Sequence, residues 1–72
     1  MKLYENAIQT DRAFIYFNKI AHISWKKRIE DYEVKIYSEA GVILQNMSER
    51  EYNSFLEAYK KITHDLAKID GF

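Results

Sequence analysis

Hydrophobic and polar residues alternate through the middle of the chain, which is typical of strands that bury one face. The clearest case is DYEVKIYS, residues 31–38, where every second residue from Tyr32 to Ile36 is apolar. Two earlier segments, 12–17 and 20–26, are rich in β-branched and aromatic residues. All three segments are therefore predicted to be strands.

The segment that follows predicts a hairpin. SEAG, residues 38–41, ends in Gly41, which can take a positive φ in a tight turn. VILQNM, residues 42–47, then returns as the partner strand. The first eleven residues, which include Leu3 and Ile8, form either an edge strand or a frayed arm, and the sequence leaves both alternatives open.

A helical period replaces the alternation from residue 48 onward. Ser48 and Glu51 have the spacing of a capping box, in which each side chain accepts a hydrogen bond from the backbone N–H of the other residue. Apolar residues then recur at steps of three and four, which predicts one buried stripe along a helix. The stripe consists of Tyr52, Phe55, Tyr59, Ile62, Leu66 and Ile69, widened by Leu56. Because Gly71 is a helix-ending residue, the predicted helix covers residues 48–70.

These elements predict a single α+β domain over residues 1–72, in which a small antiparallel β-meander of three to five strands precedes one long C-terminal α-helix. Its regions are an arm or edge strand at 1–11, the sheet at 12–47 and the helix at 48–70. The sheet face turned to the helix is expected to carry Ala21, Ile23, Trp25, Tyr32, Val34, Ile36, Val42 and Leu44. The opposite face is expected to carry Phe14, Tyr16, His22, Ser24, Lys35, Tyr37 and Gln45.

The predicted helix is longer than the predicted sheet. A helix of about 21 residues is roughly 31 Å long, whereas strands of about six residues span roughly 20 Å. The apolar tail of the helix would then project into water, so we expect a homodimer or a higher homo-oligomer that covers it. The expected oligomer interface is Tyr59, Ile62, Leu66, Ile69 and Phe72. The alternative is that the N-terminal arm folds over the same tail.

Composition places the chain in the class of small soluble domains. The 72 residues are 47% hydrophobic, which is enough to form a core. The chain has no cysteine, so no disulfide stabilises that core. No apolar run approaches the roughly 18 residues of a membrane span. Polar residues such as Glu5 and Asn6 stand where a signal peptide would be apolar, so we expect a cytoplasmic protein without membrane contact.

Aromatic and basic residues form the candidate interaction surface. It comprises Tyr16, Trp25, Lys26, Lys27, Arg28, Lys35 and Tyr37. Tyrosine, tryptophan and arginine are enriched in protein hot spots, so we expect a small interaction, regulatory or inhibitor module with a protein partner. The same residue types stack and neutralise nucleic acids, which makes nucleic-acid or nucleotide binding the alternative, including a small anionic ligand held between subunits. Eleven basic residues balance eleven acidic ones, so the charge of the whole chain favours neither partner.

Catalytic chemistry has little support in the sequence, and no catalytic, cofactor-binding or metal-binding residue is assigned. His22 and Ser24 share a predicted strand face, but two residues along a strand separate side chains by about 7 Å. That distance is too long for the direct hydrogen bond of a Ser–His pair. His64 is explained by its place near the predicted helix end, where the dipole favours a cation. The chain is therefore predicted not to be an enzyme.

Overall fold

Short strands and one α-helix make up the fold. The computed structural model describes residues 1–64 and 69–71. Its elements in chain order are β1 (Lys2–Leu3), β2 (Ala7–Gln9), β3 (Phe14–Tyr16), the 3-10 helix η1 (Phe17–Lys19), β4 (Ile20–Lys27), β5 (Tyr32–Ser38), β6 (Gly41–Met47), α1 (Glu49–Thr63) and β7 (Ile69–Gly71). The described residues thus confirm an α+β chain with antiparallel sheets, but the number of strands exceeds the three to five predicted.

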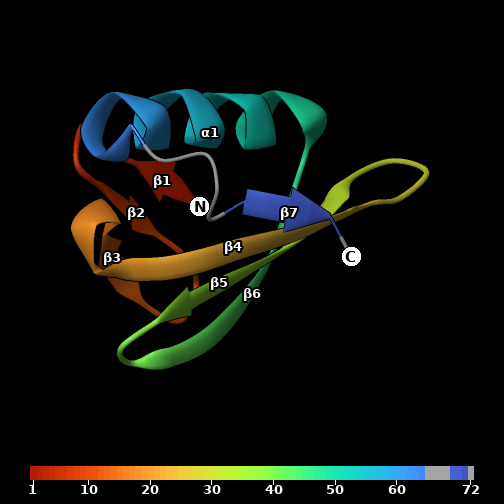
Figure 1. The fold of residues 1–72 in the computed structure, drawn as a ribbon. Coiled ribbons are helices and arrows are strands. Elements are labelled where there is room, and N and C mark those ends of the chain that lie inside the picture. The colour runs from red at the N-terminus through yellow and green to blue at the C-terminus, as the bar shows by residue number, and fades with distance from the viewer. Residues whose placement is uncertain (65–68, 72) are drawn as a thin grey trace.

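The strands form two sheets instead of one meander. The smaller has the order β1-β2-β3 and the larger has the order β6-β5-β4-β7. All pairings are antiparallel except that β7 runs parallel to β4, with Ile69 opposite Ile23. Figure 1 shows α1 over one face of the larger sheet, with the smaller sheet beneath the C-terminal end of the helix. The first residues therefore form β1 and β2, which settles the alternative left open between a strand and an arm.

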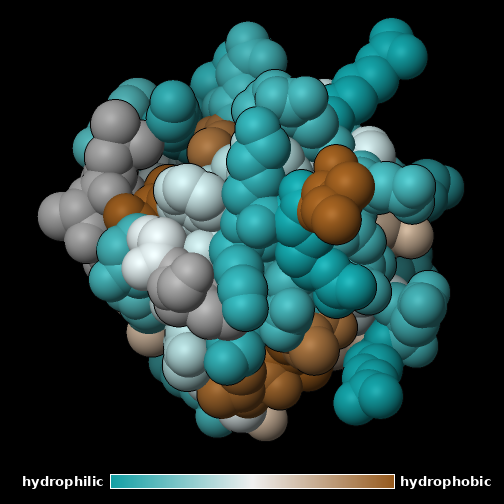
Figure 2. Space-filling model, turned by 90° about the vertical axis from the view of Figure 1, so that its right-hand side faces the viewer, coloured by the Kyte–Doolittle hydropathy of each residue, from teal (hydrophilic) through white to brown (hydrophobic). Residues whose placement is uncertain are grey.

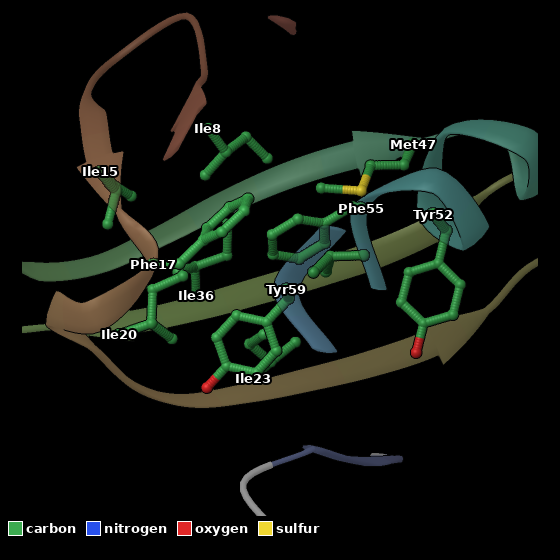
Figure 3. Close-up of a cluster of buried hydrophobic side chains, with 11 residues drawn as sticks. Ile8, Ile15, Phe17, Ile20, Ile23, Ile36, Met47, Tyr52, Phe55 and Tyr59 are labelled. Atoms are coloured by element: carbon green, nitrogen blue, oxygen red, sulfur yellow. The ribbon is translucent and has the colours of Figure 1, made fainter. Parts of the chain in front are cut away.

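One core lies between the larger sheet, α1 and the smaller sheet. Its fully or nearly fully buried members are Ile8, Ile15, Phe17, Ile20, Ile23, Val34, Ile36, Met47, Tyr52, Phe55 and Tyr59. At its centre the rings of Phe17, Phe55 and Tyr59 pack on one another, with centroids 5.9 to 6.3 Å apart (Figure 3). Burying a side chain of this size contributes roughly 1.5–3 kcal/mol. The packing of these rings therefore holds α1 against η1, the segment that connects the two sheets.

The start of the helix is confirmed in detail. The Ser48 hydroxyl accepts a hydrogen bond from the Glu51 backbone N–H at 3.1 Å, and the Glu51 carboxylate accepts one from the Ser48 N–H at 2.9 Å. Two backbone donors that a helix would leave unpaired are thereby satisfied. The capping box therefore begins the helix where the sequence predicts.

The predicted end of the helix is wrong. Helix α1 stops at Thr63, because His64 takes a left-handed conformation with φ 55° and its N–H donates to the Lys60 carbonyl. The helix is therefore about 22 Å long, close to the roughly 23 Å of the seven-residue strands β5 and β6. The mismatch of lengths on which the oligomer interface rested disappears.

The residues of the predicted oligomer interface have separate places. Tyr59 is fully buried in the core, and Ile69 lies in β7 and packs partly buried against that core. Ile62 remains 40% exposed near the helix end. Leu66 and Phe72 lie outside the described residues. Tyr59 and Ile69 thus serve this chain's own packing, and homo-oligomerisation itself stays a prediction.

The predicted sheet faces are right for β5 and wrong for β6. Val34 and Ile36 are fully buried against the helix side, as is Ile23 of β4. Val42 and Leu44 were expected beside them but are 56% and 49% exposed. Gln45 pairs with Val34 and so lies on the helix side, contrary to expectation. Strand β6 is thus turned by one residue relative to the prediction.

Strand β4 departs from regular pairing near its start. The register shifts between Ile20 and His22, so Ala21 occupies a bulge and is exposed instead of facing the helix. The predicted strand at 12–17 is shorter than expected, because residues 17–19 form η1. Phe14 and Tyr16 belong to the smaller sheet, so they do not share a face with Lys35 and Tyr37.

Candidate interaction surface

The side of the larger sheet opposite α1, called here the outer face, is the leading candidate site. Tyr37 lies between His22 and Val42 on neighbouring strands, and Lys35 lies between Ser24 and Leu44. Asp70 of β7 extends the second row beyond Ser24. Among the described residues, no element packs over this face, since α1 and the smaller sheet both lie on the other side (Figure 1).

One half of the outer face is apolar. Val42 and Leu44 stand two residues apart on β6 and both are about half exposed. Figure 2 shows hydrophobic side chains gathered at the bottom of the view, on the side of the molecule away from α1. Val42 and Leu44 alternate with the partly buried Ile43, so the second face of this strand is left exposed.

The other half of the outer face is polar and internally bonded. His22 Nε2 lies 3.0 Å from Asp70 Oδ1, and the Ser24 hydroxyl lies 3.2 Å from the same carboxylate oxygen. The His22 ring also packs against Tyr37, with centroids 5.5 Å apart. These contacts fix β7 to β4 through side chains as well as through the sheet.

Serine, histidine and aspartate also form catalytic triads, but the hydrogen bonds here connect them in a different order. A Ser–His pair needs a direct hydrogen bond so that the imidazole can take the hydroxyl proton. Here the carboxylate stands between His22 and Ser24, and both contact Asp70 instead of each other. The geometry ties strands together and provides no activated hydroxyl. Sequence reasoning missed Asp70 because it assigned residue 70 to the helix.

The residues of the predicted interaction surface do not all meet. Lys35 and Tyr37 lie on the outer face, as expected. Trp25 does not, because it lies on the helix side and its ring packs 5.9 Å from Tyr32 and 6.1 Å from Tyr52. A methyl group added at Gly71 would come within 3.3 Å of the Trp25 ring, so β7 covers it closely. Trp25 is therefore a partly buried packing residue on the helix side, and its contact with a partner stays a prediction.

The basic residues Lys26, Lys27 and Arg28 lie at the hairpin end of β4 and are exposed. Arg28 forms ion pairs with Asp31 at 3.3 Å and with Glu33 at 3.7 Å, so its charge is offset locally. Next to them Ile29 is fully exposed at the tip of the hairpin. The basic cluster is thus a mixed-charge loop beside the outer face, not a uniform cationic patch.

Tyr16 belongs to a second exposed group, on the smaller sheet. The ring of Phe14 lies between those of Tyr4 and Tyr16, with centroids 5.4 and 5.2 Å away. The Lys2 ammonium lies 5.2 Å from the centroid of the Tyr4 ring. Sequence reasoning found Phe14 and Tyr16 by their alternation but missed Tyr4, which only the pairing of β1 with β2 brings to them.

Comparisons with other proteins give no assignment. No match to this chain was found among protein-family models, curated proteins or solved structures. Within residues 1–64 and 69–71, no three His, Cys, Asp or Glu side chains gather as a metal site would require. In the same residues no helix is both long and apolar enough to cross a membrane. The function is therefore argued from the surfaces alone.

Proposed function

We propose that this chain is a small non-catalytic interaction module that binds a partner protein through its outer face. The observation that carries the proposal is the pair Val42 and Leu44, two half-exposed aliphatic residues side by side on a sheet face that α1 leaves open. Covering them removes apolar surface from water, which is the main favourable term in protein association. The remainder of the face supplies the specificity.

The polar half of the face suits recognition because its groups are already held in place. Asp70 fixes His22, and Tyr37 packs on the His22 ring, so a partner meets side chains whose rotamers are limited before binding. Association then costs less conformational entropy for each side chain it orders. A preformed face of this kind suits a regulator or inhibitor that docks on a larger protein without chemistry of its own.

The test uses the chain as bait in its native host, in three forms. Wild type and Ile62→Asp should recover the same protein partner, because Ile62 is a similarly exposed apolar residue away from the outer face. Val42→Asp should lose that partner, because a carboxylate would be buried without a counter-charge. Recovery of the same partner by all three forms would show that the outer face is not the contact surface.

Nucleic-acid or nucleotide binding is the second candidate, and the aromatic group on the smaller sheet is the observation that favours it. Exposed rings at Tyr4, Phe14 and Tyr16, with a cation at Lys2, are what a stacking platform requires. The ion pairs of Arg28 weigh against it by removing part of the positive charge. Retention of wild type on immobilised single-stranded RNA at low salt, lost in a Lys2→Glu, Phe14→Ala variant, would favour this candidate over a protein partner.

A further inference from the structure

Two hollows between the smaller sheet and the β5–β6 hairpin are together called here the groove. At one end a pocket of about 220 Å³ is lined by residues 13–16 and Lys19 on one wall, and by residues 38–40 and Ile43 on the other. At the other end a hollow of about 260 Å³ is lined by Asp11 and Arg12 facing residues 44–46. Residue numbers thus rise along one wall, from 11 to 16, where they fall along the other, from 46 to 38. Strands β3 and β6 therefore run antiparallel on opposite sides of the groove.

Both walls carry unpaired strand edges within the described residues. Strand β3 pairs with β2 alone, and β6 pairs with β5 alone. Because Thr10 N–H donates to the Ala13 carbonyl and Phe17 N–H donates to the Asn6 carbonyl, alternation places the backbone groups of Phe14 and Tyr16 on the outer edge. Across the groove, alternate residues of β6 likewise direct their backbone groups away from β5, toward the groove. One β6 carbonyl, that of Asn46, already accepts a hydrogen bond from the Gln45 side chain at 2.9 Å.

Strand β6 also lacks the features that usually protect an edge. Residues 41–47 contain no charge and no proline, and their pairing with β5 continues from Gly41 to Met47 without a bulge. Natural edges of this length are generally blunted by one of these devices or covered by another element. An edge left in this state next to a second free edge is suited to receiving one more strand.

We propose that an extended segment of a partner protein binds in this groove as an added strand, antiparallel to β6. The inference rests on the proposed function in one respect, that the partner is a protein. The backbone donors and acceptors on β3 and β6 specify another backbone as their complement, which is the basis of recognition by strand addition. Seven residues at about 3.3 Å each would span the edge from Gly41 to Met47.

The lining of the groove defines the side chains of that segment. The 220 Å³ pocket is mainly apolar, with Ala13, Ile15 and Ile43 in its walls and the rings of Phe14 and Tyr16 beside it. The charged residues at each end come as opposite pairs, Lys19 with Glu39 and Asp11 with Arg12, so no net field selects a charged ligand. The segment should therefore be uncharged, with a bulky apolar residue at the position that enters this pocket.

The experiment selects ligands from a phage-displayed library of random peptides and then uses one synthetic peptide from that selection as the probe. Affinity is measured for wild type, for Ala40→Glu and Ala13→Glu, for Asn53→Glu, and for Val42→Asp. Ala40 is exposed in the β5–β6 turn, so its substitution places a charge at the groove with little effect on folding. Asn53 is exposed on α1 and lines neither hollow, so Asn53→Glu is the control for an added charge, whereas Val42→Asp reports on the outer face.

The expected result is a peptide rich in alternating apolar residues, bound at least tenfold more weakly by Ala40→Glu and Ala13→Glu and with unchanged affinity by Asn53→Glu. Binding should slow hydrogen exchange at Phe14, at Tyr16 and at alternate amides of β6 together, and methylation of alternate peptide nitrogens should abolish it. If the library yields no binder, or if the peptide binds equally well to the groove variants, strand addition is overturned. Loss of binding in Val42→Asp alone would retain the outer face as a protein contact and reject the groove.

Discussion

Tyr52 is the residue through which pH should act most directly on stability. Its ring stacks on Tyr32 with centroids 4.5 Å apart and is 5% exposed. Burial, and secondly the neighbouring Tyr32, raise the pKa of Tyr52 from 10.0 to about 12. Below pH 10 the phenol is protonated in both the folded and the unfolded chain. Between about pH 10 and 12 only the unfolded chain ionises, so the free energy of unfolding should fall over that range.

The measurement is the urea midpoint of wild type and Tyr52→Phe as pH rises from 8 toward 12. Phenylalanine keeps the ring packing and removes the ionisable group, so the variant should lose less stability over this range than wild type does. All other ionisable groups are present in both proteins, so the comparison isolates the Tyr52 hydroxyl. Parallel curves for the two proteins would mean that Tyr52 ionises as easily in the folded chain as in the unfolded one.

At the scale of elements, alternation predicts where the strands lie, but it does not predict which face is buried when several consecutive residues are apolar. Val42, Ile43 and Leu44 are consecutive aliphatic residues, so hydropathy alone fits either face of β6. The deciding signal is the hairpin itself, because a turn at Glu39 and Ala40 places Val42 opposite Tyr37. Residues directly opposite share a face, so Val42 joins Tyr37 outside. The exposure of Val42 and Leu44 could therefore have been predicted from the hairpin register, although not from hydropathy.

The C-terminal segment shows a different limit. Ile62, Leu66 and Ile69 continue the helical spacing of Tyr52, Phe55 and Tyr59, and no proline or glycine interrupts them before Gly71. What ends the helix at Thr63 is the left-handed turn of His64, and what holds β7 is pairing to β4 some 46 residues earlier in the chain. Neither the left-handed turn nor the long-range strand pairing can be predicted from local helix propensity. The Asp70 contacts of the outer face were therefore beyond prediction from the sequence.

The helix end gives a prediction whose sign is diagnostic. A non-glycine residue in the left-handed region costs roughly 1–2 kcal/mol, so His64→Gly should relieve strain. Part of that gain is offset by the greater freedom of glycine in the unfolded chain, which leaves about 0.5–1 kcal/mol of stabilisation. If the helix instead continued through residue 64, the same change should destabilise by about 0.5–1 kcal/mol.

Urea unfolding of two further variants separates these effects. His64→Ala removes the imidazole without relieving the left-handed conformation, so it should not stabilise. Ser54→Gly, at an exposed position inside α1, should lower stability by roughly 0.5 kcal/mol or more and shows how glycine behaves within this helix. Destabilisation by His64→Gly equal to that of Ser54→Gly would contradict a helix that ends at Thr63.

At the scale of the whole molecule, a single core uses the apolar residues of both sheets and α1. Helix and strands have matching lengths, and Tyr59 and Ile69 are packed within the chain, so folding does not need a second subunit to cover a projecting helix. Two of the surfaces left open border β6: the outer face on one side of the strand and the β3–β6 groove along its edge. Any assembly of identical chains should therefore involve β6 more than the end of α1.

The energies indicate how strong such self-association would be. Pairing two outer faces would cover the exposed halves of Val42 and Leu44 in both copies, worth roughly 3–6 kcal/mol in total at about 1.5–3 kcal/mol for a whole side chain. Association costs an estimated 4–15 kcal/mol in lost translational and rotational freedom. The cost exceeds the gain over most of these ranges, so any dimer of the folded monomer should form only at high concentration.

Sedimentation velocity over a wide range of concentration measures this directly. Wild type should run as a monomer when dilute and gain mass as it is concentrated. Val42→Asp should stay monomeric, because the carboxylate would be desolvated at the contact, whereas Ile62→Asp should behave as wild type. If Ile62→Asp alone abolishes the increase, the exposed end of α1 forms the contact after all. If wild type remains monomeric throughout, homo-oligomerisation is excluded over that range.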